Sequence, residues 1–140
     1  MLHGTFRKDR DDHGPRVPIG APECPAWLPR LAKKYWGKIA PDLEAVGLLS
    51  VTDLGAFAAH CDSMGRYEEI TKKLKRLDDL LDKTPQDYMV QSAMFTVRNK
   101  LWDQVMRSAQ EFGLTPAARS KVKTSGQGQL PLGGSGWDDV

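Results

Sequence analysis

The chain has 140 residues and a formal net charge of +2, and 40% of its residues are hydrophobic, which fits one small globular domain. No apolar run approaches the ~20 residues that a membrane-spanning helix needs, and residues 1–8 lack the apolar core of a secretory signal. The two cysteines, Cys24 and Cys61, do not make a disulfide framework, so we expect a protein of the reducing cytoplasm with no membrane partner.

The N-terminal residues 1–22 mix charged side chains with Gly and Pro and contain little to bury, which predicts a disordered arm. Residues 26–40 carry apolar side chains at a spacing of four and predict the first helix. These side chains are Trp27, Leu31, Tyr35 and Ile39. Because Pro41 disfavours helical geometry at Ala40, we expect a break there, before a turn at Gly47.

Two long helices are predicted next. Apolar residues recur at intervals of three and four over residues 52–82, which predicts the second helix. The Thr84-Pro85 pair is typical of a helix start, with Thr84 as N-cap and Pro85 at the first helical position. It predicts a third helix over residues 84–112. The predicted fold class is therefore all-α, a long antiparallel helical hairpin with shorter N- and C-terminal helices.

The 84–112 helix is apolar on two sides, and a helix that is apolar over most of its circumference must be covered on most sides. We therefore expect it to form a subunit interface in a homo-oligomer. The alternative is a compact bundle that buries both stripes within one chain. The expected interface residues are Val90, Met94, Phe95, Val97, Leu101, Trp102 and Val105.

Basic residues gather in segments 30–38, 72–76 and 119–123, and the first two segments contain no acid. Such clusters can follow the phosphates of a nucleic acid. The alternative is a set of solvated helix faces, balanced by neighbouring acids or by a second subunit. The candidate DNA-binding residues are Arg30, Lys33, Lys34, Lys38, Lys72, Lys73, Arg76, Arg119, Lys121 and Lys123.

Residues 111–119 combine a helix stop with a helix start. Gly113 stands where a left-handed residue ends a helix at least cost, and Thr115 is a good N-cap. Pro116 fits the first helical position, where its missing N–H costs nothing. The segment predicts a sharp corner followed by a short final helix.

Beyond that corner, residues 123–140 are rich in Gly and Ser and predict a flexible C-terminal tail, which leaves residues 23–122 as the helical domain. The tail ends in an aromatic side chain beside two acids, an arrangement that suits docking to another protein. These docking residues are Trp137, Asp138 and Asp139.

The sequence contains no G-x-x-x-x-G-K-[ST] phosphate loop, no G-x-S-x-G or H-E-x-x-H motif and no close Cys/His set for zinc. We therefore expect a protein that is not an enzyme, with no catalytic residue, no cofactor and no metal site. The alternative is a small hydrolase or nuclease with an unrecognised site, which metal-dependent DNA cleavage would reveal.

The segment 111–119, which has the form E-F-G-L-T-P-x-x-R, resembles the end of the helical domain in one family of phage terminase small subunits. Upstream residues agree in order and spacing, and the resemblance extends over about residues 23–121. These residues are Cys24-Pro25-Ala26-Trp27-Leu28, Trp36, Ile39-Ala40-Pro41-Asp42-Leu43, Gly47-Leu48-Leu49, Asp53 and Cys61.

The resemblance implies a non-catalytic adaptor of viral DNA packaging in the host cytoplasm. In that family the small subunit forms a ring, recognises the packaging site on double-stranded viral DNA and delivers the DNA to the large subunit, which carries the ATPase and nuclease. No DNA-contact residue of the family can be transferred, so the basic candidates depend on charge alone, and we expect contact with phosphates rather than bases. A helical protein-interaction module without nucleic-acid binding remains the alternative.

Overall fold

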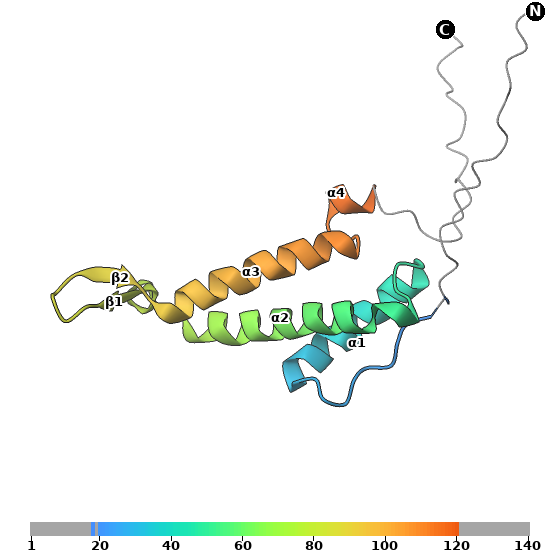
Figure 1. Ribbon diagram of the computed structural model, residues 1–140, viewed down its shortest axis with the longest axis horizontal. Coiled ribbons are helices and arrows are strands. Elements are labelled where there is room, and N and C mark those ends of the chain that lie inside the picture. The colour runs from blue at the N-terminus through green and yellow to red at the C-terminus, as the bar shows by residue number, and fades with distance from the viewer. Residues whose placement is uncertain (1–17, 19, 121–140) are drawn as a thin grey trace, which may run out of the picture.

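The structure, a computed structural model, describes residue 18 and residues 20–120. It is mostly helical, as the sequence predicts. Helices α2 (Leu54–Lys73) and α3 (Ala93–Glu111) lie side by side and antiparallel, α1 (Arg30–Ala45) packs on α2, and the short α4 (Pro116–Arg119) follows α3 (Figure 1). None of the described helices combines the length and the apolar character needed to cross a membrane.

Part of the predicted N-terminal arm contacts the helices. The Ser50 hydroxyl donates a hydrogen bond to the carbonyl of Pro18 (3.1 Å), and Ala21 also packs against the core. The backbone N–H of Ala21 donates to the Glu44 carboxylate at 3.1 Å. These contacts begin a few residues before the predicted domain boundary at residue 23. The rest of the arm, and the predicted tail, lie outside the described residues.

Helix α1 begins later than the sequence pattern predicts. The expected start near residue 26 is wrong because Pro29 disfavours helical geometry in the residue before it, so the helix begins at Arg30. Trp27, which the pattern assigned to the buried stripe, is 73% exposed. The side chains that α1 buries lie three or four residues apart and are Ala32, Trp36, Ala40 and Leu43.

Helix α1 also continues through Pro41, where we expected a break. Pro41 cannot donate a helical hydrogen bond, which is a cost. Ala40 and Leu43, on either side of it, are 5% and 4% exposed. Burial of these neighbours offsets the missing hydrogen bond and keeps the helix on the surface of the core.

Two glycines end helices as predicted. Gly47 and Gly113 have φ angles of 69° and 65°, a left-handed conformation that glycine adopts without strain. In each case the following leucine donates its backbone N–H to the carbonyl five residues earlier, at 2.8 Å. Thr115 then caps α4 by accepting a hydrogen bond from the N–H of Ala118 (3.3 Å). The predicted corner after α3 is therefore confirmed.

The predicted continuous helices over residues 52–82 and 84–112 are wrong where they meet, because α2 ends at Lys73 and α3 begins at Ala93. The connecting elements are a 3-10 helix at Leu77–Leu80 and two antiparallel strands, β1 (Leu81–Lys83) and β2 (Met89–Gln91). Both strands are exposed along their whole length. A two-stranded hairpin of this kind is only marginally stable by itself in water.

Local hydrogen bonds explain this junction. The Asp79 carboxylate accepts from the backbone N–H groups of Lys75 (3.0 Å) and Arg76 (2.8 Å), which offers the chain an alternative to helical hydrogen bonds. The Thr84-Pro85 pair lies at the turn between the strands rather than at a helix start. Ser92 is the residue that caps α3, because its hydroxyl oxygen accepts a hydrogen bond from the backbone N–H of Phe95 (3.1 Å).

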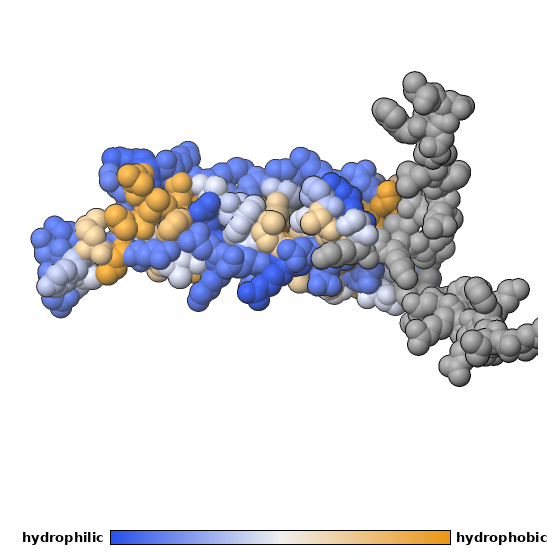
Figure 2. All heavy atoms as spheres, turned by 90° about the horizontal axis from the view of Figure 1, so that it is seen from above, coloured by the Kyte–Doolittle hydropathy of each residue, from blue (hydrophilic) through white to orange (hydrophobic). Residues whose placement is uncertain are grey.

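The core lies at the end of the α2–α3 pair that α1 covers. Phe57 at its centre is 0% exposed, and its ring centroid lies 4.7 Å from that of Trp36 and 5.3 Å from that of Phe112. The opposite end carries β1 and β2, and apolar surface gathers there (Figure 2). We call this the hairpin end; its exposed large side chains are Leu77, Leu81, Tyr88, Met89, Val90, Met94, Val97 and Trp102.

Candidate nucleic-acid interface

Helix α1 crosses α2 at Gly65. A Cβ atom at this position would lie 3.0 Å from the backbone nitrogen of Ala32 and 3.1 Å from the Cβ of Leu31, so the close approach of the two helices favours glycine here. The crossing places the first turn of α1 beside the second half of α2. It thereby brings together the basic segments 30–38 and 72–76, which are far apart in the sequence.

A groove of about 470 Å³ lies beside this crossing. Pro29 and the first residues of α1, Arg30 to Ala32, form one wall, and the α2 residues Asp62, Gly65, Arg66, Glu69, Lys72 and Lys73 form the other. The wall from α2 and the first turn of α1 together supply four cationic side chains, those of Arg30, Arg66, Lys72 and Lys73. We call this the α1–α2 groove.

The cations of the α1–α2 groove outnumber its acids. Arg66 Nε donates to the Asp62 carboxylate at 2.7 Å, and this contact raises the pKa of the Arg66 guanidinium further. Within the described residues, no ion pair involves Arg30 or Lys73. The first turn of α1 carries no acidic residue and no side-chain cap, so its backbone N–H groups add to the positive potential.

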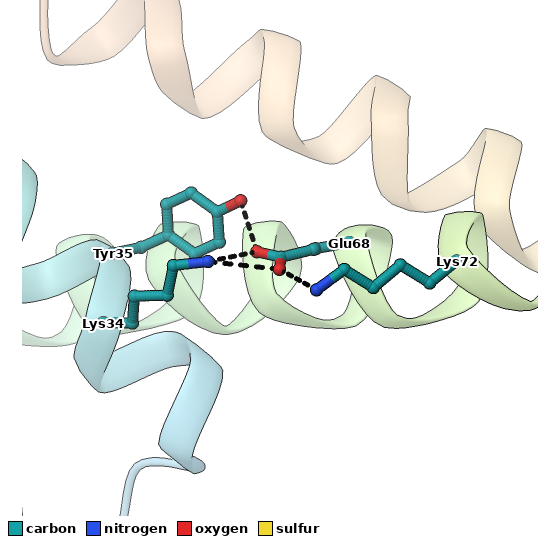
Figure 3. A network of polar contacts seen from close by, with 4 residues as sticks. All are labelled: Lys34, Tyr35, Glu68 and Lys72. Atoms are coloured by element: carbon teal, nitrogen blue, oxygen red, sulfur yellow. Dashed lines mark hydrogen bonds and ion pairs between the residues drawn. The ribbon is translucent and has the colours of Figure 1, made fainter.

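Glu68 forms a network at the border of the groove (Figure 3). The Tyr35 hydroxyl donates to one carboxylate oxygen at 2.7 Å, and Lys34 Nζ donates to both oxygens, at 3.1 and 3.2 Å. Lys72 Nζ, one turn further along α2, also forms an ion pair with the carboxylate. A single carboxylate therefore links α1 to α2 through two lysines and a tyrosine.

The network shifts the acidity of its members. The hydrogen bonds from Lys72, Tyr35 and Lys34 lower the pKa of Glu68 to about 2. Burial, followed by the hydrogen bond and the charge of Glu68, raises the pKa of Tyr35 to about 12. At neutral pH the site therefore holds a charged carboxylate and a neutral phenol.

The chain was compared with known protein families. The sequence model described as "Phage terminase, small subunit" matches residues 32–129, which include almost all of α1 and the whole of α2, α3 and α4. The chain belongs to the phage terminase small subunit family. The resemblance stated from the sequence is confirmed. No curated protein and no solved structure matches the chain.

Membership in the terminase small subunit family supports a role in phage DNA packaging. Members of this family in general associate with DNA and with a terminase large subunit, and they are generally non-catalytic. Over residues 18 and 20–120, no three side chains of His, Cys, Asp or Glu are grouped so that they could hold a metal ion.

Four of the ten sequence-predicted DNA-binding residues lie in the α1–α2 groove or at its border. Arg30, Lys72 and Lys73 line it, and Lys34 belongs to the Glu68 network. Arg66 is not among the residues predicted from the sequence, because it is a single basic residue between Asp62 and Glu68. Its spacing of seven residues from Lys73 is a signal that could have found it, since this spacing places two side chains on the same face of a helix.

The other candidates are not gathered in the groove. Lys33 donates to a backbone carbonyl at 2.7 Å, Lys38 lies exposed on α1, and Arg76 forms an ion pair beyond the end of α2. Arg119 belongs to α4, which packs on α3. Lys121 and Lys123 lie outside the described residues, as do the predicted docking residues Trp137, Asp138 and Asp139.

The predicted interface residues fall into two groups. Leu101 and Val105 are 9% and 5% exposed, because they face α2 within the same chain, and Phe95 is half-buried. The remaining members are exposed by 43–47% and are Val90, Met94, Val97 and Trp102. Of the predicted interface residues, only this exposed group is accessible to a second chain.

Proposed function

We propose that this chain is the DNA-binding adaptor of a viral packaging terminase, which recognises the packaging site and regulates the large subunit that carries the ATPase and nuclease. It would act in the host cytoplasm, without catalytic residues or a cofactor of its own. Family membership supports this role. The observation that carries the DNA contact is the α1–α2 groove, in which cations of two helices face one concave surface.

The shape and charge of the groove favour phosphates over base edges. Its cations are side chains of Arg and Lys on an exposed helix face, the groups that proteins use to follow a DNA backbone. Arg30 and Lys73 form no ion pair among the described residues, whereas Arg66 and Lys72 are paired with carboxylates. About two to four phosphates would therefore be neutralised, which gives a slope of about −2 to −4 for the logarithm of the binding constant against that of the salt concentration. Binding through this groove should therefore be similar for unrelated DNA sequences, with packaging-site preference added by other contacts.

The test is an anisotropy titration of labelled duplex DNA with the full chain, at several salt concentrations. The double variant Arg30→Gln/Lys73→Gln should weaken binding to all sequences and reduce the salt slope by about two. The matched control is Lys100→Gln/Arg107→Gln, which removes the same charge from exposed positions on α3 outside the groove. Equal losses in the two variants would mean that only net charge matters, and salt-insensitive binding would contradict the proposal.

We further propose that the chain forms a ring-shaped homo-oligomer through the hairpin end. Support comes from the exposure of Val97 and Trp102 on α3, close to a two-stranded hairpin that has little to bury within one chain. A contact that joins different surfaces of successive subunits closes into a ring when the rotation permits. Light scattering during gel filtration should give a native mass many times the 15.6 kDa of one chain.

One observation favours the alternative of a helical interaction module without DNA binding. Lys34 and Lys72, two of the predicted DNA contacts, already pair with Glu68 within the chain. If most basic residues served such internal pairs, long duplex DNA would not bind even at low salt. A gel-shift titration at low and moderate salt separates the two functions.

The docking of the C-terminal tail to the large subunit also remains a prediction. It concerns Trp137, Asp138 and Asp139, and is tested by deleting residues 137–140 and measuring pull-down by the purified large subunit. Retained pull-down would assign the contact to another part of the chain.

A further inference from the structure

The Glu68 network has the composition of an anion-binding site that is already occupied. Two ammonium groups and one phenolic hydroxyl, contributed by α1 and α2, converge on the carboxylate (Figure 3). Lys72 belongs to this network and to the wall of the α1–α2 groove at once. A phosphate oxygen of DNA lying along the groove would compete for the same donors.

The partners of the network differ in exposure. The side chain of Glu68 is only 14% exposed, whereas those of Lys34 and Lys72 are 43% and 66% exposed. The lysines can turn toward an anion at the surface, because each ammonium stands on a flexible stem. Glu68 is less exposed than the lysines and also accepts the hydrogen bond from Tyr35 at 2.7 Å, so the departure of a lysine does not leave it without a partner.

We propose that Glu68 is an internal substitute for a DNA phosphate, which holds Lys34 and Lys72 at the edge of the groove and competes with DNA for them. Glu68 thereby limits the affinity of the groove for DNA. Such a limit suits an adaptor that must release its DNA to a partner, because tight phosphate contacts slow dissociation. This inference depends on the proposed function, since it assumes that DNA lies along the α1–α2 groove.

The test is the variant Glu68→Gln, which removes the negative charge but keeps an oxygen that can accept from Tyr35. Each additional phosphate contact is worth up to a factor of about ten at ~0.1 M salt. We therefore expect the variant to bind duplex DNA about three- to tenfold more tightly, with a steeper salt dependence and without preference for one sequence. The readout is the dissociation constant by anisotropy at several salt concentrations.

Two comparisons separate this role from a general charge effect and from a structural role. Glu111→Gln removes the same charge from an exposed position on α3 and should change the affinity far less. In the Lys34→Gln/Lys72→Gln background, Glu68→Gln should give no gain, because the released lysines are absent. Melting temperature and native mass are measured for each variant, so that a loss of fold is recognised directly.

The outcomes are distinct. If wild-type protein binds DNA and Glu68→Gln binds no more tightly than Glu111→Gln, the inference is wrong and the proposed function stands. A gain that persists in the Lys34→Gln/Lys72→Gln background would also overturn it, because the effect would not pass through these lysines. If neither wild type nor any variant binds duplex DNA at low salt, the proposed function itself fails.

Discussion

The crossing of α1 over α2 makes Gly65→Ala the most informative substitution for the fold. The new Cβ would lie 3.0 Å from the backbone nitrogen of Ala32, where ordinary contacts begin at 3.4 Å. Since backbone atoms cannot turn aside, α1 must shift. Overpacking of this kind costs about 1–3 kcal/mol, and the better helix propensity of alanine returns about 0.5–1 kcal/mol. The net expectation is a loss of about 0–2.5 kcal/mol relative to wild type, and of about 1–3 kcal/mol relative to a helical glycine replaced without overpacking.

Urea unfolding followed by circular dichroism measures this loss, and Gly55→Ala and Gly37→Ala are matched controls. Both glycines are helical, and apart from the neighbouring backbone of its own helix nothing lies within 4 Å of a Cβ placed on either of them. These controls should gain about 0.5–1 kcal/mol of stability.

A displaced α1 would also open the α1–α2 groove, so Gly65→Ala should weaken DNA binding while the controls leave it unchanged. If Gly65→Ala is as stable as Gly55→Ala, α1 does not cross α2 at this residue, and the reasoning about the groove is refuted.

Further predictions concern assembly, pH and the core. Val97→Asp places a charge in the proposed interface and should lower the native mass measured by light scattering. The control Gln104→Asp, at an exposed position on the same helix, should leave the mass unchanged. Equal masses for the two variants would exclude the hairpin end as the interface. Because the pKa of Glu68 is lowered in the folded state, its contribution to stability is present above about pH 4.5 and is lost as the pH falls toward about 2. The melting temperature of wild type should therefore approach that of Glu68→Gln over this range, and a constant difference would argue against the network. Phe57→Ala should cost about 3–5 kcal/mol in urea unfolding, because the side chain is fully buried between Trp36 and Phe112; a loss below about 1 kcal/mol would contradict the described core.

Local chemistry made several elements predictable from the sequence. The helix stops at Gly47 and Gly113 and the cap at Thr115 each depend on a few neighbouring residues, so their residue types were sufficient. The start of α1 also depends on neighbouring residues, because Pro29 sets it. The prediction was wrong because it followed the spacing of the apolar residues and did not take Pro29 into account.

The strands β1 and β2 were missed for a different reason. Apolar residues continue at helical spacing past Lys73, and Leu77 and Leu81 were counted as part of a helix face. In the structure both are exposed, by 78% and 44%. Periodicity shows which residues share a helix face but not whether another helix covers that face. Here α1 is too short to reach the hairpin end.

The basic segments of the candidate site could be predicted from the sequence, but their contact in the folded chain could not. The basic segments 30–38 and 72–76 were identified from charge, yet their meeting depends on the contact at Gly65, which joins residues distant in the sequence. The pairing of Glu68 with Lys34 and Tyr35 is likewise long-range. A sequence pattern could show Glu68 and Lys72 one turn apart, but not the second lysine that completes the network.

Lysine footprinting tests whether DNA binds in the α1–α2 groove, because it locates DNA on the surface of the protein. The full chain is treated with an amine-reactive reagent, with and without duplex DNA, and modification is read by mass spectrometry. DNA should protect Lys72 and Lys73 on α2 and Lys34 on α1, but it should not change the reactivity of Lys83 at the hairpin end or of Lys100 on α3. Protection of Lys83 and Lys100 without protection of Lys72 and Lys73 would contradict DNA binding in the α1–α2 groove.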